Sequence, residues 1–182
     1  LGFSMASQIM SENATLVLNR VMDYLGNAAY INKTLAYQIN NGDLDIDNPE
    51  EKHNIYNSYR HYLELYPEFV GLFYGDETGR FIFAKKLPDS TISLRTVSQD
   101  DKTIHSTWIH EDPIWYKNGY QNSKDTLDEG YNPKKRTWYK AARSTGVNTW
   151  SDVYIFSSDK KPGITNAQPI FNSDNYLRGV LG

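Results

Sequence analysis

The chain has no cysteine among its 182 residues, which excludes disulfide frameworks, thiolate metal sites and cysteine nucleophiles. Long apolar runs are missing as well. The best of them, Leu16–Leu18 and Val70–Tyr74, are a few residues each, whereas a membrane-spanning helix needs about 20. An excess of positive charge is also absent, because 19 Lys and Arg residues stand against 22 Asp and Glu residues. We therefore expect no nucleic-acid partner, and membrane contact only through segments outside this chain.

The signatures of common enzyme sites are absent too. The sequence has no glycine-rich phosphate loop, no G-x-G-x-x-G motif and no G-x-S-x-G nucleophile elbow. The four histidines lack metal-site spacing, and the paired acids Asp100-Asp101 and Glu111-Asp112 fit solvated loop charges. A hydrolase that uses Glu111 or Asp112 has little support. We predict no catalytic residue, no metal site and no cofactor.

Aromatic residues, by contrast, are abundant. They make up 14% of the chain, with 14 Tyr beside 7 Phe and 4 Trp, while apolar residues of all kinds reach 39%. Large rings bury much area and keep a polar tip for a hydrogen bond. The core must therefore depend on such rings.

A long helix is predicted at the start of the chain. Residues 5–41 contain no proline, and the spacing of their apolar side chains predicts a helix of about 35 residues and about 50 Å, ended by Gly42. The stripe comprises Val17, Val21, Tyr24, Ala28, Ile31 and Leu35. Two interpretations remain open: a packing element, or a helix that also forms a homodimer through this narrow stripe. In the second case, aspartate at Val21 or Ile31 is expected to abolish pairing.

The rest of the sequence predicts one more long helix and then strands. That helix begins at Asn48-Pro49-Glu50-Glu51 and ends at Pro67. Because consecutive strands are joined by short turns, the sheet is antiparallel and the fold class is α+β. Strands are expected at 69–74, 80–85, 92–97, 103–109, 149–156, 164–171 and 177–181, with a polar loop at 117–135 and a short helix at 138–144.

The densest chemical feature is Tyr131-Asn132-Pro133-Lys134-Lys135-Arg136-Thr137-Trp138-Tyr139, followed by Trp150-Ser151-Asp152-Val153-Tyr154. A guanidinium beside Trp and Tyr rings suits a small carboxylate, because arginine offers two parallel donors and the rings exclude water. A helix that begins at Trp138 would add free N–H groups. The same residues are equally consistent with a cluster that packs its rings against the sheet.

The segment Tyr131–Tyr139, continued by Lys140-Ala141-Ala142, resembles the signature of double Cache domains, also called PDC sensor domains. These are PAS-like extracytoplasmic modules of bacterial chemoreceptors, sensor histidine kinases and diguanylate cyclases. The long first helix fits as well, and the resemblance covers almost the whole chain. Further matching parts are Tyr66-Pro67-Glu68-Phe69, Asp76-Glu77-Thr78-Gly79, Trp150–Tyr154, Gly163-Ile164-Thr165, Pro169-Ile170 and Gly179-Val180-Leu181-Gly182.

The resemblance implies a periplasmic sensor and not an enzyme. The family places two PAS-like lobes on one long helix. Residues 1–47 are then expected to form a stalk helix and its loop, and residues 48–182 the membrane-distal lobe with its last strand cut short. The alternative is a module with a vestigial pocket that serves only for dimerisation.

Amino-acid-binding members of the family hold their ligand with a Tyr-x4-Arg-x-Trp-Tyr motif. By this resemblance, Tyr131, Arg136 and Trp138 contact the carboxylate, whereas Tyr139 and Tyr154 contact the amino group. Phe156 stands at a position that is often acidic on the amino-group side. The expected ligand is a small carboxylate that enters between the sheet and loop 111–135, with an amino acid favoured and pyruvate-like or other organic acids as alternatives.

Overall fold

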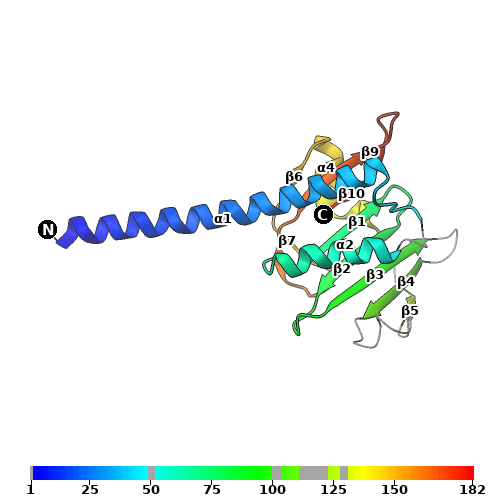
Figure 1. The fold of residues 1–182 in the computed structure, drawn as a ribbon, viewed down its shortest axis with the longest axis horizontal. Helices are drawn as coiled ribbons and strands as arrows, with labels where there is room; N and C mark the ends of the chain where they lie inside the picture. Colours follow the sequence, from blue (N-terminus) through cyan, green and yellow to red (C-terminus); the bar gives the residue numbers. More distant parts are fainter. Residues whose placement is uncertain (1, 49–51, 100–103, 111–122, 128–130) are drawn as a thin grey trace.

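The computed structural model describes residues 2–48, 52–99, 104–110, 123–127 and 131–182. A long helix, α1, runs over Gly2–Asn41, and its N-terminal half projects beyond the rest of the molecule (Figure 1). A second helix, α2, covers Lys52–Leu65. No helix within these described ranges has an apolar stretch long enough to cross a membrane.

The remaining elements form an antiparallel sheet with one short helix. The main sheet has the order β5-β4-β3-β2-β1-β10-β9-β6, and β7 and β8 form a separate two-stranded ribbon. The strands are β1 (Gly71–Asp76), β2 (Phe81–Lys86), β3 (Ile92–Gln99), β4 (Ile104–His110), β5 (Ser123–Leu127), β6 (Thr149–Trp150), β7 (Tyr154–Ile155), β8 (Pro162–Gly163), β9 (Asn166–Phe171) and β10 (Leu177–Leu181), and the short helix is α4 (Thr137–Thr145). The predicted α+β fold, with a long first helix and an antiparallel sheet, is confirmed.

Two local predictions need correction. The segment 117–135, expected as a loop throughout, contains strand β5 and a 3-10 turn at Pro133–Lys135. The strand expected at 149–156 is divided between β6 of the main sheet and β7 of the ribbon. The division occurs at Ser151. The backbone N–H of Thr165 donates to the side-chain Oγ of Ser151 at 3.0 Å, and not to a backbone carbonyl as in a regular strand pair.

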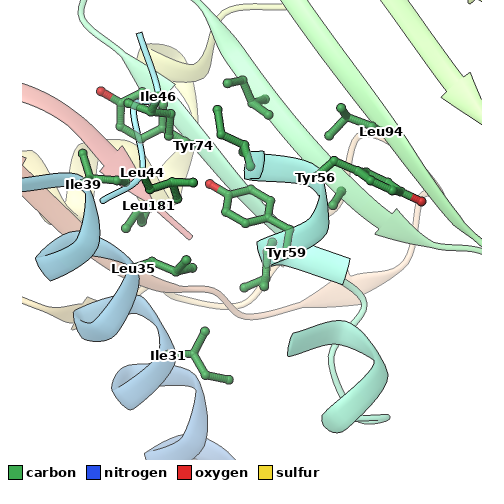
Figure 2. Packing of buried hydrophobic residues seen from close by; sticks show 14 of the residues in the cluster. Ile31, Leu35, Ile39, Leu44, Ile46, Tyr56, Tyr59, Tyr74, Leu94 and Leu181 are labelled. Carbon is green, nitrogen blue, oxygen red and sulfur yellow. The ribbon is translucent and has the colours of Figure 1, made fainter. Parts of the chain in front are cut away.

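The two faces of the sheet carry two separate cores because successive residues of a strand point to opposite sides. On one face, Leu72, Tyr74 and Leu94 pack with residues of α1 and α2 (Figure 2). On the other face, Phe81, Val97 and Val180 pack with Trp138, Tyr139 and Ala142 of α4. The sheet is therefore a middle layer, with the long helices on one side and α4 on the other.

Helix α1 joins the core through its C-terminal part. Ile31 and Leu35 are fully buried and Ile39 is nearly so, whereas Val21 remains 45% exposed. Figure 2 shows Ile31, Leu35 and Ile39 directed toward Tyr59 of α2. The expectation that Ile31 belongs to a stripe available to a second copy is therefore wrong, since this side chain fills the core of its own lobe.

An ion-pair network fastens the loop that follows α1 to the sheet. Asp47 accepts hydrogen bonds from both Arg80 and Arg178, and the Nε of Arg178 lies 3.1 Å from its Oδ2. Arg80 also donates from Nε to Asp76 at 2.9 Å. Burial raises the pKa of Asp47, but the hydrogen bonds and charges of the two arginines outweigh it and hold that pKa below its usual value.

We expect Asp47→Asn to lower the melting temperature by about 2–4 °C at pH 7, which corresponds to about 1 kcal/mol for a half-exposed network. A carboxylate with a depressed folded pKa stabilises the fold above its unfolded pKa and loses that effect as pH falls through the folded value. The difference from wild type should therefore narrow as pH falls toward the folded pKa of Asp47, which lies below its usual value, and close below it. Melting curves across pH measure it, with the exposed Asp43→Asn as matched control. A constant difference down to pH 3 would contradict the assignment.

Candidate functional site

A cavity of about 370 Å³ opens on the α4 side of the sheet. Its walls are largely aromatic and apolar, with a few polar side chains among them. Four of its residues, Tyr24, Leu25, Ala28 and Asn32, belong to α1. The sheet and the α4 region supply Phe73, Phe81, Phe83, Arg95, Tyr131, Arg136, Trp138, Trp150 and Tyr154. This shape and composition are typical of a small-molecule site.

Close contact of β1 with the 3-10 turn and with α4 positions Trp138, which lines the cavity. A Cβ on Gly75 would lie 2.6 Å from Cβ of Pro133 and 3.1 Å from Cη2 of Trp138, so glycine is needed here. Trp138 is 2% exposed, and its ring centroid lies 4.7 Å from that of Phe73. The missing side chain at Gly75 thus lets the indole approach the sheet closely.

Arg136 lies just before the first turn of α4. Its backbone is extended, with φ −80° and ψ 150°, so Arg136 is the N-cap residue and the helix begins after it. The Cζ of Arg136 lies 6.0 Å from the ring centroid of Tyr154. The Tyr154 hydroxyl is 2.8 Å from Oγ1 of Thr165, and burial raises the pKa of this phenol against the opposing effects of Thr165 and Arg136. Arg136 and Tyr154 therefore form one pair in the cavity wall.

Arg95 and Tyr131 form a second such pair. The Cζ of Arg95, on β3, lies 5.1 Å from the Tyr131 ring centroid, and Tyr131 packs on Phe81 at 4.6 Å between centroids. Burial raises the pKa of Tyr131, although the charges of Arg136 and Arg95 oppose this. Burial also lowers the pKa of Arg95. The phenol of Tyr131 is thus within electrostatic reach of both guanidinium groups.

Arg95 was missed in the sequence. Its signal was the period of two on β3, where Arg95 pairs with Phe83 of β2 and therefore shares the face of the aromatic side chains. The neighbouring sequence does not identify an arginine in a strand as a pocket residue, because an arginine on a solvent-exposed strand face has the same alternating pattern.

The structure places four of the five predicted site residues at the cavity: Tyr131, Arg136, Trp138 and Tyr154. Tyr139 is not among the lining residues. It is fully buried, and its hydroxyl donates to Oε1 of Glu77 at 2.9 Å. Consecutive helical residues are about 100° apart, so Trp138 and Tyr139 leave α4 in different directions. Burial, and then the hydrogen bond to Glu77, raise the pKa of Tyr139.

The ligand was expected to enter beside loop 111–135. Residues 111–122 and 128–130 of that loop, including Glu111 and Asp112, lie outside the described residues. Among the side chains that the structure does describe, no group of three or more His, Asp or Glu could hold a metal ion. Within the same part of the chain, Glu68 is the one acidic residue of the cavity wall.

Solved structures with the same fold are ligand-binding domains of chemoreceptors. The domain of Tlp3 from Campylobacter jejuni, with 4-methylisoleucine, has a TM-score of 0.56 and 17% identity over 92% of this chain and 53% of that one. PctB from Pseudomonas aeruginosa, with L-arginine, gives 0.55 and 17% over 89% and 49%. PctC from the same organism, with GABA, gives 0.58 and 16% over 96% and 61%.

The chain therefore spans about half the length of the first two of these domains. No curated protein matches the sequence. A family model does: residues 82–182, more than half of the chain, match the first PDC sensor domain of methyl-accepting chemotaxis protein-like proteins. This match agrees with the fold and with the resemblance in the Tyr131–Tyr139 segment. The chain belongs to this family of PDC sensor domains, which are sensors and not enzymes.

Proposed function

We propose that this sensor domain binds a small carboxylate, with an amino acid favoured, and that Arg136 holds the carboxylate. The observation that carries the proposal is the position of Arg136 at an aromatic cavity, 6.0 Å from the Tyr154 ring. A guanidinium presents two parallel donors to a carboxylate, and surrounding rings strengthen that contact because they exclude water.

The two phenols of the cavity complete the proposed contact. Burial raises the pKa of both Tyr131 and Tyr154, so each keeps its proton at neutral pH. Tyr131 then donates a hydrogen bond to the carboxylate, and Tyr154 contacts the amino group. Trp138 forms an apolar wall beside them. Support for an amino acid comes from similar domains, which were solved with 4-methylisoleucine, L-arginine and GABA. We keep Tyr139 as a proposed contact of the amino group, although its hydroxyl donates to Glu77 in this structure and must change partner to reach a ligand.

Helix α1 provides the proposed route for the signal. Asn32, on α1, belongs to the cavity wall and donates from Nδ2 to the backbone oxygen of Asn166 at 2.8 Å. A ligand that contacts this wall has a higher affinity for the conformation in which α1 takes one position than for the conformation with another. Binding then shifts the population of conformations in proportion to that difference in affinity. We place residues 1–47 as the stalk and residues 48–182 as the membrane-distal lobe of an extracytoplasmic receptor region.

We also infer that α1 pairs with a second copy of the chain through its exposed part. That part carries exposed apolar side chains: Ile9, Leu16, Val17 and Val21 are each 45–67% exposed. Exposed apolar stripes of this length on a helix favour association.

Removal of the Arg136 charge tests the carboxylate site. A panel of amino acids and small organic acids is titrated by calorimetry, and we expect Arg136→Gln to weaken any hit by roughly 100-fold because a desolvated charge pair is lost. Lys135→Gln, an adjacent exposed cation, is the matched control and should bind like wild type. Unchanged binding by Arg136→Gln would refute the site. No hit in the whole panel, with a folded wild-type protein, would favour the vestigial pocket.

A further inference from the structure

Asn32 of α1 carries an unused hydrogen-bond acceptor in the wall of the cavity. It follows Tyr24 and Ala28 at intervals of four residues, so the three side chains share one face of α1 and line the cavity together. Asn32 is only 2% exposed, and its Oδ1 atom accepts no hydrogen bond from any residue that the structure describes. A buried amide oxygen without a donor is unfavourable and uncommon. A donor on a bound ligand would satisfy it.

The orientation of the Asn32 amide is fixed by its neighbours. Its Nδ2 donates to the backbone oxygen of Asn166 at 2.8 Å and to Oδ1 of the same residue at 3.0 Å. Asn166 in turn donates to Asn148 at 2.9 Å and accepts from it at 2.8 Å. A backbone oxygen can only accept, so the amide of Asn32 cannot turn over to bring Oδ1 to that position. The contact between α1 and β9 therefore leaves this oxygen without a donor.

The same contact places Asn32 near the tyrosine proposed for the amino group. Thr165, whose Oγ1 is 2.8 Å from the Tyr154 hydroxyl, directly precedes Asn166 in the chain. Consecutive Cα atoms are about 3.8 Å apart, so the partners of Tyr154 and of Asn32 are immediate neighbours. Asn32, Thr165 and Tyr154 all line the cavity. The acceptor on α1 and the phenol of Tyr154 thus belong to one part of the wall.

The acid expected beside the amino group is missing from this part of the wall. Phe156, which stands at that position, lines the cavity with a ring that offers no oxygen to an ammonium group. Among the wall residues that the structure describes, Glu68 is the one acid. It is partly exposed, and its charge acts on Lys86 and raises the pKa of that ammonium. Asn32, by contrast, is enclosed and has an acceptor to offer.

We infer that Oδ1 of Asn32 accepts a hydrogen bond from the amino group of the bound ligand. The inference rests on the proposed function for the carboxylate end and adds a residue that recognises the other end. It makes Asn32 a determinant of specificity for an amino acid over the same acid without its amino group, because an ammonium that donates to a carbonyl forms a charge-assisted hydrogen bond. Since Asn32 lies on α1, the ligand then connects Arg136 directly to the helix proposed to carry the signal.

Matched ligand pairs test the inference by calorimetry. The standard L-amino acids are titrated beside acids that lack only the amino group, such as 3-methylbutanoate for L-valine and propanoate for L-alanine. Wild type should bind an amino acid that it recognises roughly 10- to 100-fold more tightly than the matched acid, as expected for a hydrogen bond to a charged group. Asn32→Leu, which is similar in size and lacks the oxygen, should lower that ratio roughly 10-fold and leave the matched acid within about twofold.

Asn148→Ala is the matched control. Asn148 belongs to the same amide network but not to the cavity wall, so its loss should leave the ratio as in wild type. The backbone oxygen of Asn166 still holds the Asn32 amide in that variant. If Asn32→Leu shows no cooperative melt, Asn32→Ala removes the same oxygen without added methyl groups, and the ratio should fall in the same way.

Three results would overturn the inference and leave the proposed function intact. The first is equal affinity of wild type for an amino acid and its matched acid. The second is an equal loss of both ligands in the Asn32 variant, because Asn32 would then only support the pocket. The third is a ratio that persists in the Asn32 variant and is lost in Glu68→Gln, which would assign the amino group to Glu68. Absence of binding by every ligand of the series would overturn the inference together with the proposed function.

Discussion

Replacement of Trp138 by alanine is expected to lower the free energy of unfolding by about 3–5 kcal/mol. The indole is 2% exposed and lies between the sheet and α4, with ring centroids of Phe73 at 4.7 Å and Tyr139 at 5.4 Å. The surrounding strands are fixed by their ladders, so the space left by the ring cannot close fully. For a chain of this size the melting temperature should fall by about 10 °C.

Urea unfolding monitored by circular dichroism measures this effect, with two control variants. Trp138→Phe keeps most of the apolar volume and should lose much less. Tyr139→Phe removes only the hydroxyl that donates to Glu77, and we expect a loss of about 1 kcal/mol. A Trp138→Ala protein as stable as Tyr139→Phe would show that the indole is not packed as described. Because the indole also forms a wall of the cavity, its loss should weaken ligand binding as well.

Local patterns in the sequence predicted most of the fold. Helix α1 was visible because a proline-free stretch kept its helical spacing, and β1 and β2 were visible because they flank the turn at Gly79, whose φ is 92°. Strand β5 was missed because Ser123–Leu127 is polar and has no alternation to detect. Its place at the edge comes from pairing with β4, a tertiary effect that overrides propensity.

The candidate site was less predictable than the fold. The motif supplied the residue types at Tyr131, Arg136 and Trp138, but it did not fix the direction of each side chain. Tyr139 follows Trp138 directly and yet faces Glu77, whereas Arg95, far away in the sequence, reaches the cavity. The position of Arg95 depends on the register of β2 with β3, which no local pattern contains.

The largest loss of stability is expected from Leu35→Asp, which should leave the chain unfolded at 25 °C. Leu35 is fully buried between the sheet and α2, in the core drawn in Figure 2. A carboxylate at that position has no described cation to pair with, and burying a polar group without a partner costs several kcal/mol beyond the lost apolar contacts. Thermal melts by circular dichroism measure it. Ile31→Asp should behave in the same way, so it cannot serve to test pairing between copies.

Val21→Asp is the matched control, because Val21 lies on the stripe predicted from the sequence, on the same helix, but is 45% exposed. At low protein concentration its melting temperature should stay within about 2 °C of wild type, as for most exposed substitutions. Sedimentation equilibrium at high concentration should show weaker self-association if the exposed part of α1 pairs with a second copy. A Val21→Asp protein as unstable as Leu35→Asp would contradict the division of α1. That division assigns its C-terminal part to the core of the lobe and leaves its N-terminal part for a partner.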